Sequence, residues 1–227
     1  MKSTGIAMNN NNSVFILKDP VSSITHYIAF AAAILLTPAL LIHASGKNCD
    51  NTALIGLSIF ILSMILLYGA SGTYHALNLK GWKAKLLKRL DHLMIFVLIA
   101  GSYTPICLSL LPRKSGFPLL ISVWAFALVG MLVKFFWINC PKWFSSLIYI
   151  AMGWLCVFVF PQLWRTLSGP AFGWLLTGGI LYTVGGIIYA LKPRLLKNAK
   201  YWGPHEVFHV FVMMGSACHF VFMFLYI

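Results

Sequence analysis

Two histidines four residues apart, His205 and His209, begin the last apolar segment of the chain. On a helix, residues i and i+4 lie on one face with Cβ atoms about 5–6 Å apart, so both imidazoles can bind one metal ion. The segment is long enough to cross a bilayer, where polar side chains are costly and usually mark function. The pair therefore predicts a metal site at one end of a membrane helix.

Three further side chains that suit metal chemistry stand at the ends of other apolar segments. Ser71 and His75 lie one helical turn apart near the end of one segment, and Asp91 begins the next. Three neutral imidazoles with a carboxylate or a water are typical of catalytic zinc sites. We interpret Asp91 as a ligand or as a general base that holds the metal-bound water, and Ser71 as a donor to that water or to an oxyanion.

Each of these residues also has a structural interpretation. Asp91 could cap the third helix or pair with Arg89, and a single histidine such as His75 near a helix end is often an interfacial residue. His26, toward the same end of the first segment, is a candidate for a supporting contact to the site rather than a ligand. The pattern as a whole favours metal binding more than any one residue does.

Composition places the chain among polytopic membrane proteins. Of its 227 residues, 60% are hydrophobic and 9% are charged, which excludes an ordinary soluble domain. We expect an all-α bundle of seven transmembrane helices, with a polar cytoplasmic tail at 1–20 and one membrane domain at 21–227. The expected spans are 22–43, 53–76, 91–111, 117–138, 143–162, 171–191 and 205–226.

The distribution of Lys and Arg predicts the orientation of the bundle. The net charge is +13, but the basic residues lie mostly in short segments between apolar runs, which favours anionic lipid headgroups over nucleic acid as partners. Twelve of them lie on the side that holds the N-terminus and four on the other side, with Lys134 inside a span. The N-terminus and the five candidate site residues should therefore be cytoplasmic, and the C-terminus should be outside.

Two local patterns refine this arrangement. Residues 82–90, WKAKLLKRL, place Trp and Leu on one stripe among lysines, which predicts a short amphipathic helix on the cytoplasmic leaflet. Three prolines inside spans predict kinks, at Pro38, Pro105 and Pro161.

Four stretches of the chain resemble the progestin and adipoQ receptor family, and specifically its bacterial haemolysin III branch. They are SSITHYIAF at 22–30, SGTYHA at 71–76, RLDHLMIFVLIAGSYTP at 89–105 and HEVFHVFVMMGSACHF at 205–220. The resemblance covers nearly the whole chain. Its S-x-x-x-H, D and H-x-x-x-H set is shared with the alkaline ceramidases of a wider hydrolase superfamily.

The resemblance implies a zinc ion held by His75, His205 and His209, with Asp91 at the metal or its water and Ser71 beside it. It also implies seven spans in a bacterial cytoplasmic membrane.

One departure from the family pattern lies at the entrance to the first span. Asp19 and Ser22 or Ser23 stand where this branch usually shows Glu and Asn before the Thr-His pair. The role of this entrance therefore stays open.

Three functions fit these expectations. The first is a zinc-dependent hydrolase of a lipid amide or ester, with ceramidase-like chemistry implied by resemblance. The second is a non-enzymatic regulator or receptor-like protein that binds a small lipid and uses zinc to fix its helices. The third is a cytolysin or channel, which the haemolysin name suggests although the sequence shows no pore-lining charge. Membrane lipids are the expected partners in each case.

Overall fold

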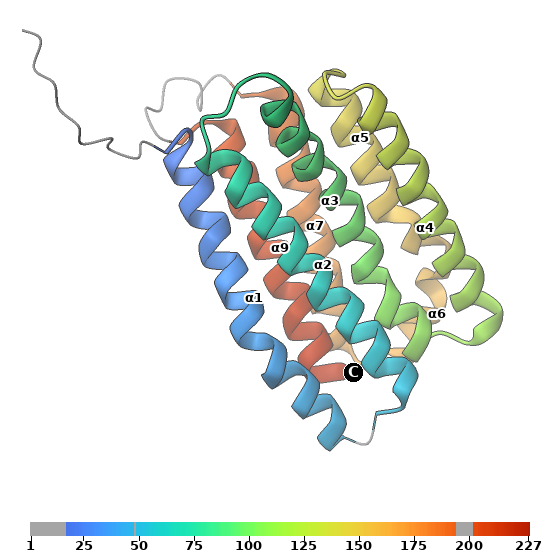
Figure 1. Ribbon diagram of the computed structural model, residues 1–227. Coiled ribbons are helices and arrows are strands. Elements are labelled where there is room, and N and C mark those ends of the chain that lie inside the picture. The colour runs from blue at the N-terminus through green and yellow to red at the C-terminus, as the bar shows by residue number, and fades with distance from the viewer. Residues whose placement is uncertain (1–16, 48, 194–201) are drawn as a thin grey trace, which may run out of the picture.

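The computed structural model describes residues 17–47, 49–193 and 202–227. Within these ranges every regular element is a helix, and there is no strand. Seven helical stretches are long and apolar enough to cross a membrane, as predicted (Figure 1). The chain is therefore an integral membrane protein with an all-α bundle. Most of the polar tail predicted at 1–20 lies outside the described residues.

Six of the seven crossings are single helices, and the fifth is built from three pieces. The single helices are α1 (Pro20–Gly46), α2 (Asn51–Ala76), α3 (Gly81–Ser109), α4 (Arg113–Phe136), α7 (Gly169–Leu191) and α9 (Pro204–Tyr226). The fifth crossing consists of α5 (Lys142–Gly153), the 3₁₀ helix η1 (Trp154–Val159) and α6 (Phe160–Thr166). Pro161 lies in the first turn of α6, directly after this break, whereas α1 and α3 continue through their prolines.

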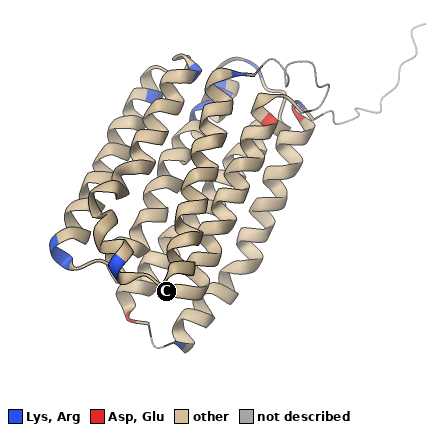
Figure 2. Cartoon of the chain, turned by 180° about the vertical axis from the view of Figure 1, so that it is seen from behind, with Lys and Arg blue, Asp and Glu red and all other residues tan. Residues whose placement is uncertain are grey.

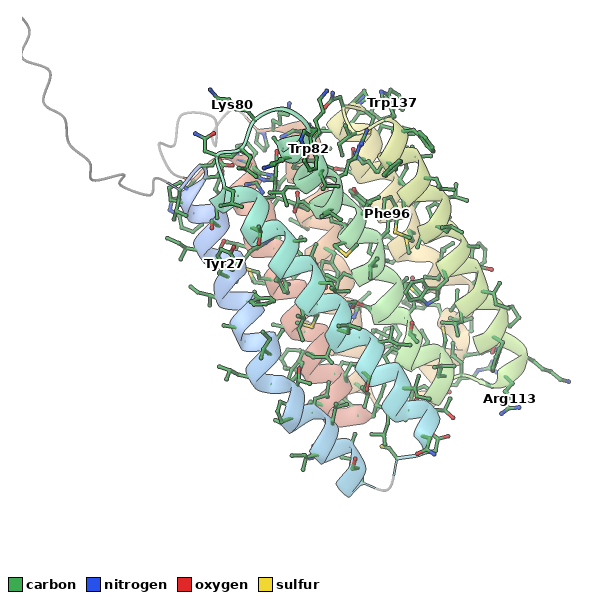
Figure 3. The ribbon with its side chains drawn as sticks, in the orientation of Figure 1. Tyr27, Lys80, Trp82, Phe96, Arg113 and Trp137 are labelled. Atoms are coloured by element: carbon green, nitrogen blue, oxygen red, sulfur yellow. The ribbon has the colours of Figure 1, made fainter. Side chains whose placement is uncertain are left out.

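The third helix begins at Gly81 rather than at residue 91. The amphipathic segment 82–90 is its first part and not a separate helix. The segment contains no Gly or Pro, and Lys, Leu and Arg are good helix formers, so nothing breaks the backbone hydrogen bonds before Asp91. Trp82 is 70% exposed at this end, and Figure 3 shows Lys80 and Trp82 at the end of the bundle opposite Arg113.

Among the described residues, the basic ones lie at the two ends of the bundle, and the middle of the bundle holds almost no charged residue (Figure 2). The apolar side chains that point outward there, such as Leu35 and Phe158, are 77% and 79% exposed. Such a band suits the hydrocarbon core of a bilayer, which is about 30 Å thick.

Hydrogen bonds inside the bundle tie α2, α7 and α9 together. The Tyr68 hydroxyl donates to Ser216 Oγ at 2.6 Å, and Tyr182 Oη lies 2.8 Å from the same oxygen. Helix α1 packs against both α2 and α9. The end of α2 and the start of α9 both lie next to the start of α1.

Helices α2 and α3 approach closely where Gly56 faces Pro105. A Cβ atom at Gly56 would lie 2.7 Å from Pro105 Cα, which is backbone and cannot move aside. Small residues of this kind let membrane helices pack with their backbones close together.

Replacing Gly56 by alanine should therefore destabilise the bundle. We expect Gly56→Ala to cost about 1–3 kcal/mol, as overpacking does in other cores, and to lower the thermal midpoint in detergent. Gly173→Ala is the matched control because a Cβ at Gly173 of α7 meets nothing within 4 Å. Equal midpoints for the two variants would contradict this close approach.

Candidate metal centre

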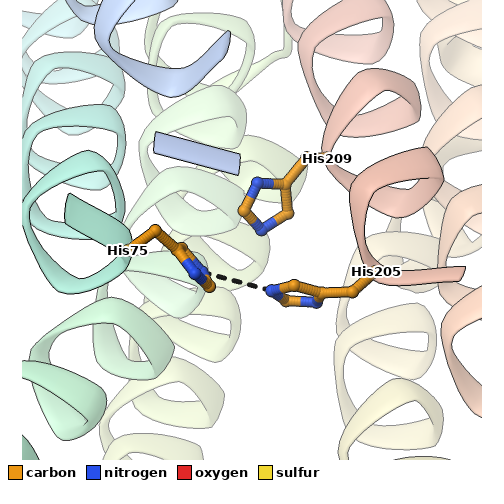
Figure 4. A group of neighbouring side chains, drawn as sticks. All are labelled: His75, His205 and His209. Atoms are coloured by element: carbon orange, nitrogen blue, oxygen red, sulfur yellow. Dashed lines mark hydrogen bonds between the residues drawn. The ribbon is translucent and has the colours of Figure 1, made fainter. Parts of the chain in front are cut away.

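Three histidines from two helices meet at one end of the bundle. His75 comes from the last turn of α2, and His205 and His209 come from the first two turns of α9. One ring nitrogen of each lies within 4.8 Å of the others, and this group could hold a metal ion. Figure 4 shows the three rings turned toward one another. The structure thus brings together the three residues that the sequence predicts as metal ligands.

The geometry of the nitrogens suits one ion. The Nε2 atoms of His75 and His205 lie 3.1 Å apart. Two nitrogens on one tetrahedral zinc ion, each about 2.0–2.1 Å from it, lie about 3.3 Å apart. The ring centroid of His209 lies 4.4 Å from that of His205 and 4.9 Å from that of His75. All three candidate ligand atoms are imidazole nitrogens, which suit zinc and similar ions.

Local sequence explains why α9 presents its pair. The helix begins at Pro204, a residue whose fixed φ suits the first turn. His205 and His209 then follow at the i, i+4 spacing that places both on one face. Both have an Nδ1 atom that is buried and has no hydrogen-bond partner among the described residues.

Asp91 and Ser71 lie beside the histidine group but are not part of it. Asp91 is 5% exposed, and its Oδ2 is 3.3 Å from Nδ1 of His92. Ser71 Oγ is buried without a partner among the described residues. Both side chains line the same cavity as His205. They are placed to contact a molecule bound at the histidines.

The structure does not support the two structural roles considered for Asp91, which are capping of the third helix and pairing with Arg89. The residue before α3 is Lys80, so Asp91 does not cap that helix. The Arg89 guanidinium lies over the ring of Phe135, at 4.8 Å from its centroid, and its contact is therefore with this ring and not with Asp91.

His26 of α1 covers the group from one side. Its ring stacks on that of His209, with centroids 3.8 Å apart and 12° between the planes. Its two nitrogens are buried and have no partner among the described residues. His26 therefore restricts the position of the His209 ring.

Asp19 is the residue of this site that the sequence did not assign. It immediately precedes α1, and its Oδ2 lies 2.9 Å from Nδ1 of His75. Burial raises the pKa of Asp19, but the hydrogen bond with His75 and the charge of Lys18, 3.4 Å away, outweigh it and hold that pKa below its ordinary value. Asp19 is therefore ionised at neutral pH. Its place before Pro20 gave no hint of this contact, because the partner is 56 residues away.

A long apolar cavity leads from the histidines into the bundle. Its lining comes mainly from α3, α5, η1, α6, α7 and α9. On α7 it extends from Tyr189, near the histidines, to Phe172 in the first turn at the other end. At 1.5 Å per residue this stretch is about 25 Å long. Such a shape suits an extended hydrocarbon chain.

Comparison with known proteins agrees with this architecture. The family model described as "Haemolysin-III related" matches residues 15–220. The chain is 38% identical over 210 residues to a "Hemolysin-3 homolog" of Bacillus subtilis, covering 91% of this chain and 93% of that protein. It is also 38% identical over 216 residues to "Hemolysin-3" of Bacillus cereus, covering 94% of this chain and 93% of that protein.

The chain is also similar, more distantly, to a protein of an animal. The chain is 23% identical over 197 residues to an "Adiponectin receptor protein" of Drosophila melanogaster, covering 71% of this chain and 40% of that protein. The match of the family model over residues 15–220, the two Bacillus proteins and the fold together show the family to which the chain belongs. It belongs to the haemolysin III family of integral membrane proteins.

Proposed function

We propose that this protein is a zinc-dependent hydrolase of a lipid amide or ester, with its site at the cytoplasmic face of a bacterial cytoplasmic membrane. The observation that carries the proposal is the junction of two features. Three imidazoles converge at one end of the bundle, and two of them, His205 and His209, line a long apolar cavity. Asp91 and Ser71 line the same cavity.

The histidines fit zinc by number, type and spacing. His75, His205 and His209 would hold the ion and leave a fourth position for water or substrate. A zinc ion bound there supplies a water whose pKa is about 7 and a Lewis acid that polarises a carbonyl group. His75 and His209 are only 3% and 2% exposed, so bulk water competes little for these nitrogens.

The roles of the neighbouring polar groups follow from their positions. Asp91 would accept a proton from the attacking water, because its carboxylate lies in the cavity and outside the histidine group. Ser71 lies one turn before His75, and its hydroxyl has no hydrogen-bond partner within the geometric limits among the described residues, which suits donation to the developing oxyanion. His92 contacts Asp91 and orients its carboxylate.

The cavity supports a lipid as substrate. Its walls are mainly hydrophobic and bury an acyl chain, which positions the amide or ester carbonyl at the histidines. The excess of Lys and Arg on the side of the N-terminus supports a cytoplasmic location for this end. Leaflet lipids could then reach the site without leaving the membrane.

Metal analysis tests the ligand assignment. We expect about one zinc ion per chain in the purified protein and a large loss of zinc in His75→Ala, His205→Ala and His209→Ala. His43→Phe is the matched control, because His43 stacks on Phe224 at the far end and a phenyl ring keeps that contact. Zinc content that is unchanged in all three alanine variants would remove the basis of the assignment.

Fatty-acid release from a panel of ceramides, N-acyl amides and acyl esters tests the reaction. We expect Asp91→Asn to lower the rate by about 10²–10⁴-fold, the usual contribution of a general base, while zinc stays bound. Asp50→Asn is the control, because Asp50 caps α2 at the other end.

A zinc-loaded protein that hydrolyses no member of the panel would contradict the catalytic proposal and favour structural zinc. Lysis of liposomes that persists in His209→Ala would favour a cytolysin instead.

A further inference from the structure

The segment before α1 is attached to the end of α2 through one residue of the metal centre. The backbone N–H of Asp19 donates to the carbonyl oxygen of His75 at 2.9 Å, and that of Lys18 donates to Ala76 at 3.2 Å. The Asp19 carboxylate then turns back onto the His75 ring, with Oδ2 at 2.9 Å from Nδ1. Backbone and side chain of Asp19 thus contact the same histidine.

This contact determines which nitrogen of His75 is free. Because the Asp19 carboxylate accepts at Nδ1, that nitrogen carries the proton. The lone pair of Nε2 then points into the histidine group, where it lies 3.1 Å from Nε2 of His205. A carboxylate in this position fixes the tautomer and the ring orientation of a metal ligand and raises its basicity.

In the part of the chain that the structure describes, His205 and His209 have no such partner. Nδ1 of His205 and Nδ1 of His209 are buried, and neither has a hydrogen-bond partner among the described residues. Among the described residues, His75 is the one imidazole of the three whose outer nitrogen is held by a charged group. The negative charge of Asp19 also offsets part of the charge of a divalent cation bound by three neutral rings.

We propose that Asp19 is a positioning residue of the metal centre, which orients His75 and strengthens metal binding through it. The inference rests on the metal binding proposed above and not on the hydrolytic reaction. It gives the entrance to the first span a defined role. Helix α1 supports this role, since Ser22 Oγ also donates to Glu206 Oε1 of α9 at 3.2 Å.

A purely structural role for Asp19 makes a different prediction. If Asp19 only anchors the chain before α1, its loss should lower the thermal stability of the metal-free protein and leave metal affinity unchanged. If it acts through His75, the affinity itself should fall. Metal affinity and metal-free stability must therefore be measured separately.

The experiment is titration of the full-length, metal-free protein with Zn²⁺ in competition with a chromophoric chelator. We expect Asp19→Ala to bind Zn²⁺ about 10–100-fold more weakly than wild type, the usual effect of losing such a partner. Asp19→Asn keeps the size and the backbone contacts but loses the charge, so it should also bind more weakly. Asp19→Glu should bind more tightly than Asp19→Ala because it restores the charge.

Asp50→Ala is the matched control. Asp50 caps the other end of α2, where its side chain accepts from the backbone N–H of Ala53 at 2.8 Å. Its loss should lower thermal stability without changing Zn²⁺ affinity.

The outcomes separate the two proposals. Wild type that binds no Zn²⁺ overturns both of them. Wild type that binds Zn²⁺ with the same affinity as Asp19→Ala and Asp19→Asn overturns this inference alone and leaves the proposed metal centre standing.

Discussion

The convergence of three imidazoles within 4.8 Å is the constraint on which the rest of the site depends. A buried polar nitrogen without a partner costs free energy, and the cost grows in the low dielectric of a membrane protein. Two of the three rings have an outer nitrogen without a protein partner among the described residues. A metal ion shared by the three inner nitrogens would satisfy those atoms at once and so would offset part of the cost of burying the rings.

The bundle meets this constraint by joining distant parts of the chain at one end. His75 ends one helix and His205 begins another, 130 residues later. Helix α1 packs against both helices that carry the histidines. It places His26 on His209, and Asp19, just before it, contacts His75. The first helix therefore supports the ligands without contributing one. The rest of the bundle, especially α3 and α5 to α7, forms the apolar cavity that leads away from them.

Much of this arrangement could be predicted from the sequence because it follows from membrane thickness. A span has a nearly fixed length, so counting the spans assigns His75 and His205 to one end of the bundle. The i, i+4 spacing then brings His209 to the same face. The early start of α3 was missed, since the amphipathic segment 82–90 differs in composition from a span but not in helix propensity. Hydropathy cannot distinguish a helix end from a separate interfacial helix.

The Asp19 contact and the cavity could not be predicted. Both depend on side chains from helices far apart in sequence, and neither has a periodic pattern. For the same reason the sequence could not decide whether Asp91 binds the metal or stands beside it. The structure leaves Asp91 outside the histidine group and next to His92.

X-ray absorption at the zinc edge would show whether the three histidines bind zinc, because the spectrum reports the number and type of the ligand atoms. We expect zinc bound by three imidazole nitrogens at about 2.0–2.1 Å, with one further oxygen ligand. A spectrum with sulfur ligands from the cysteines, or one typical of zinc surrounded by water alone, would contradict this expectation.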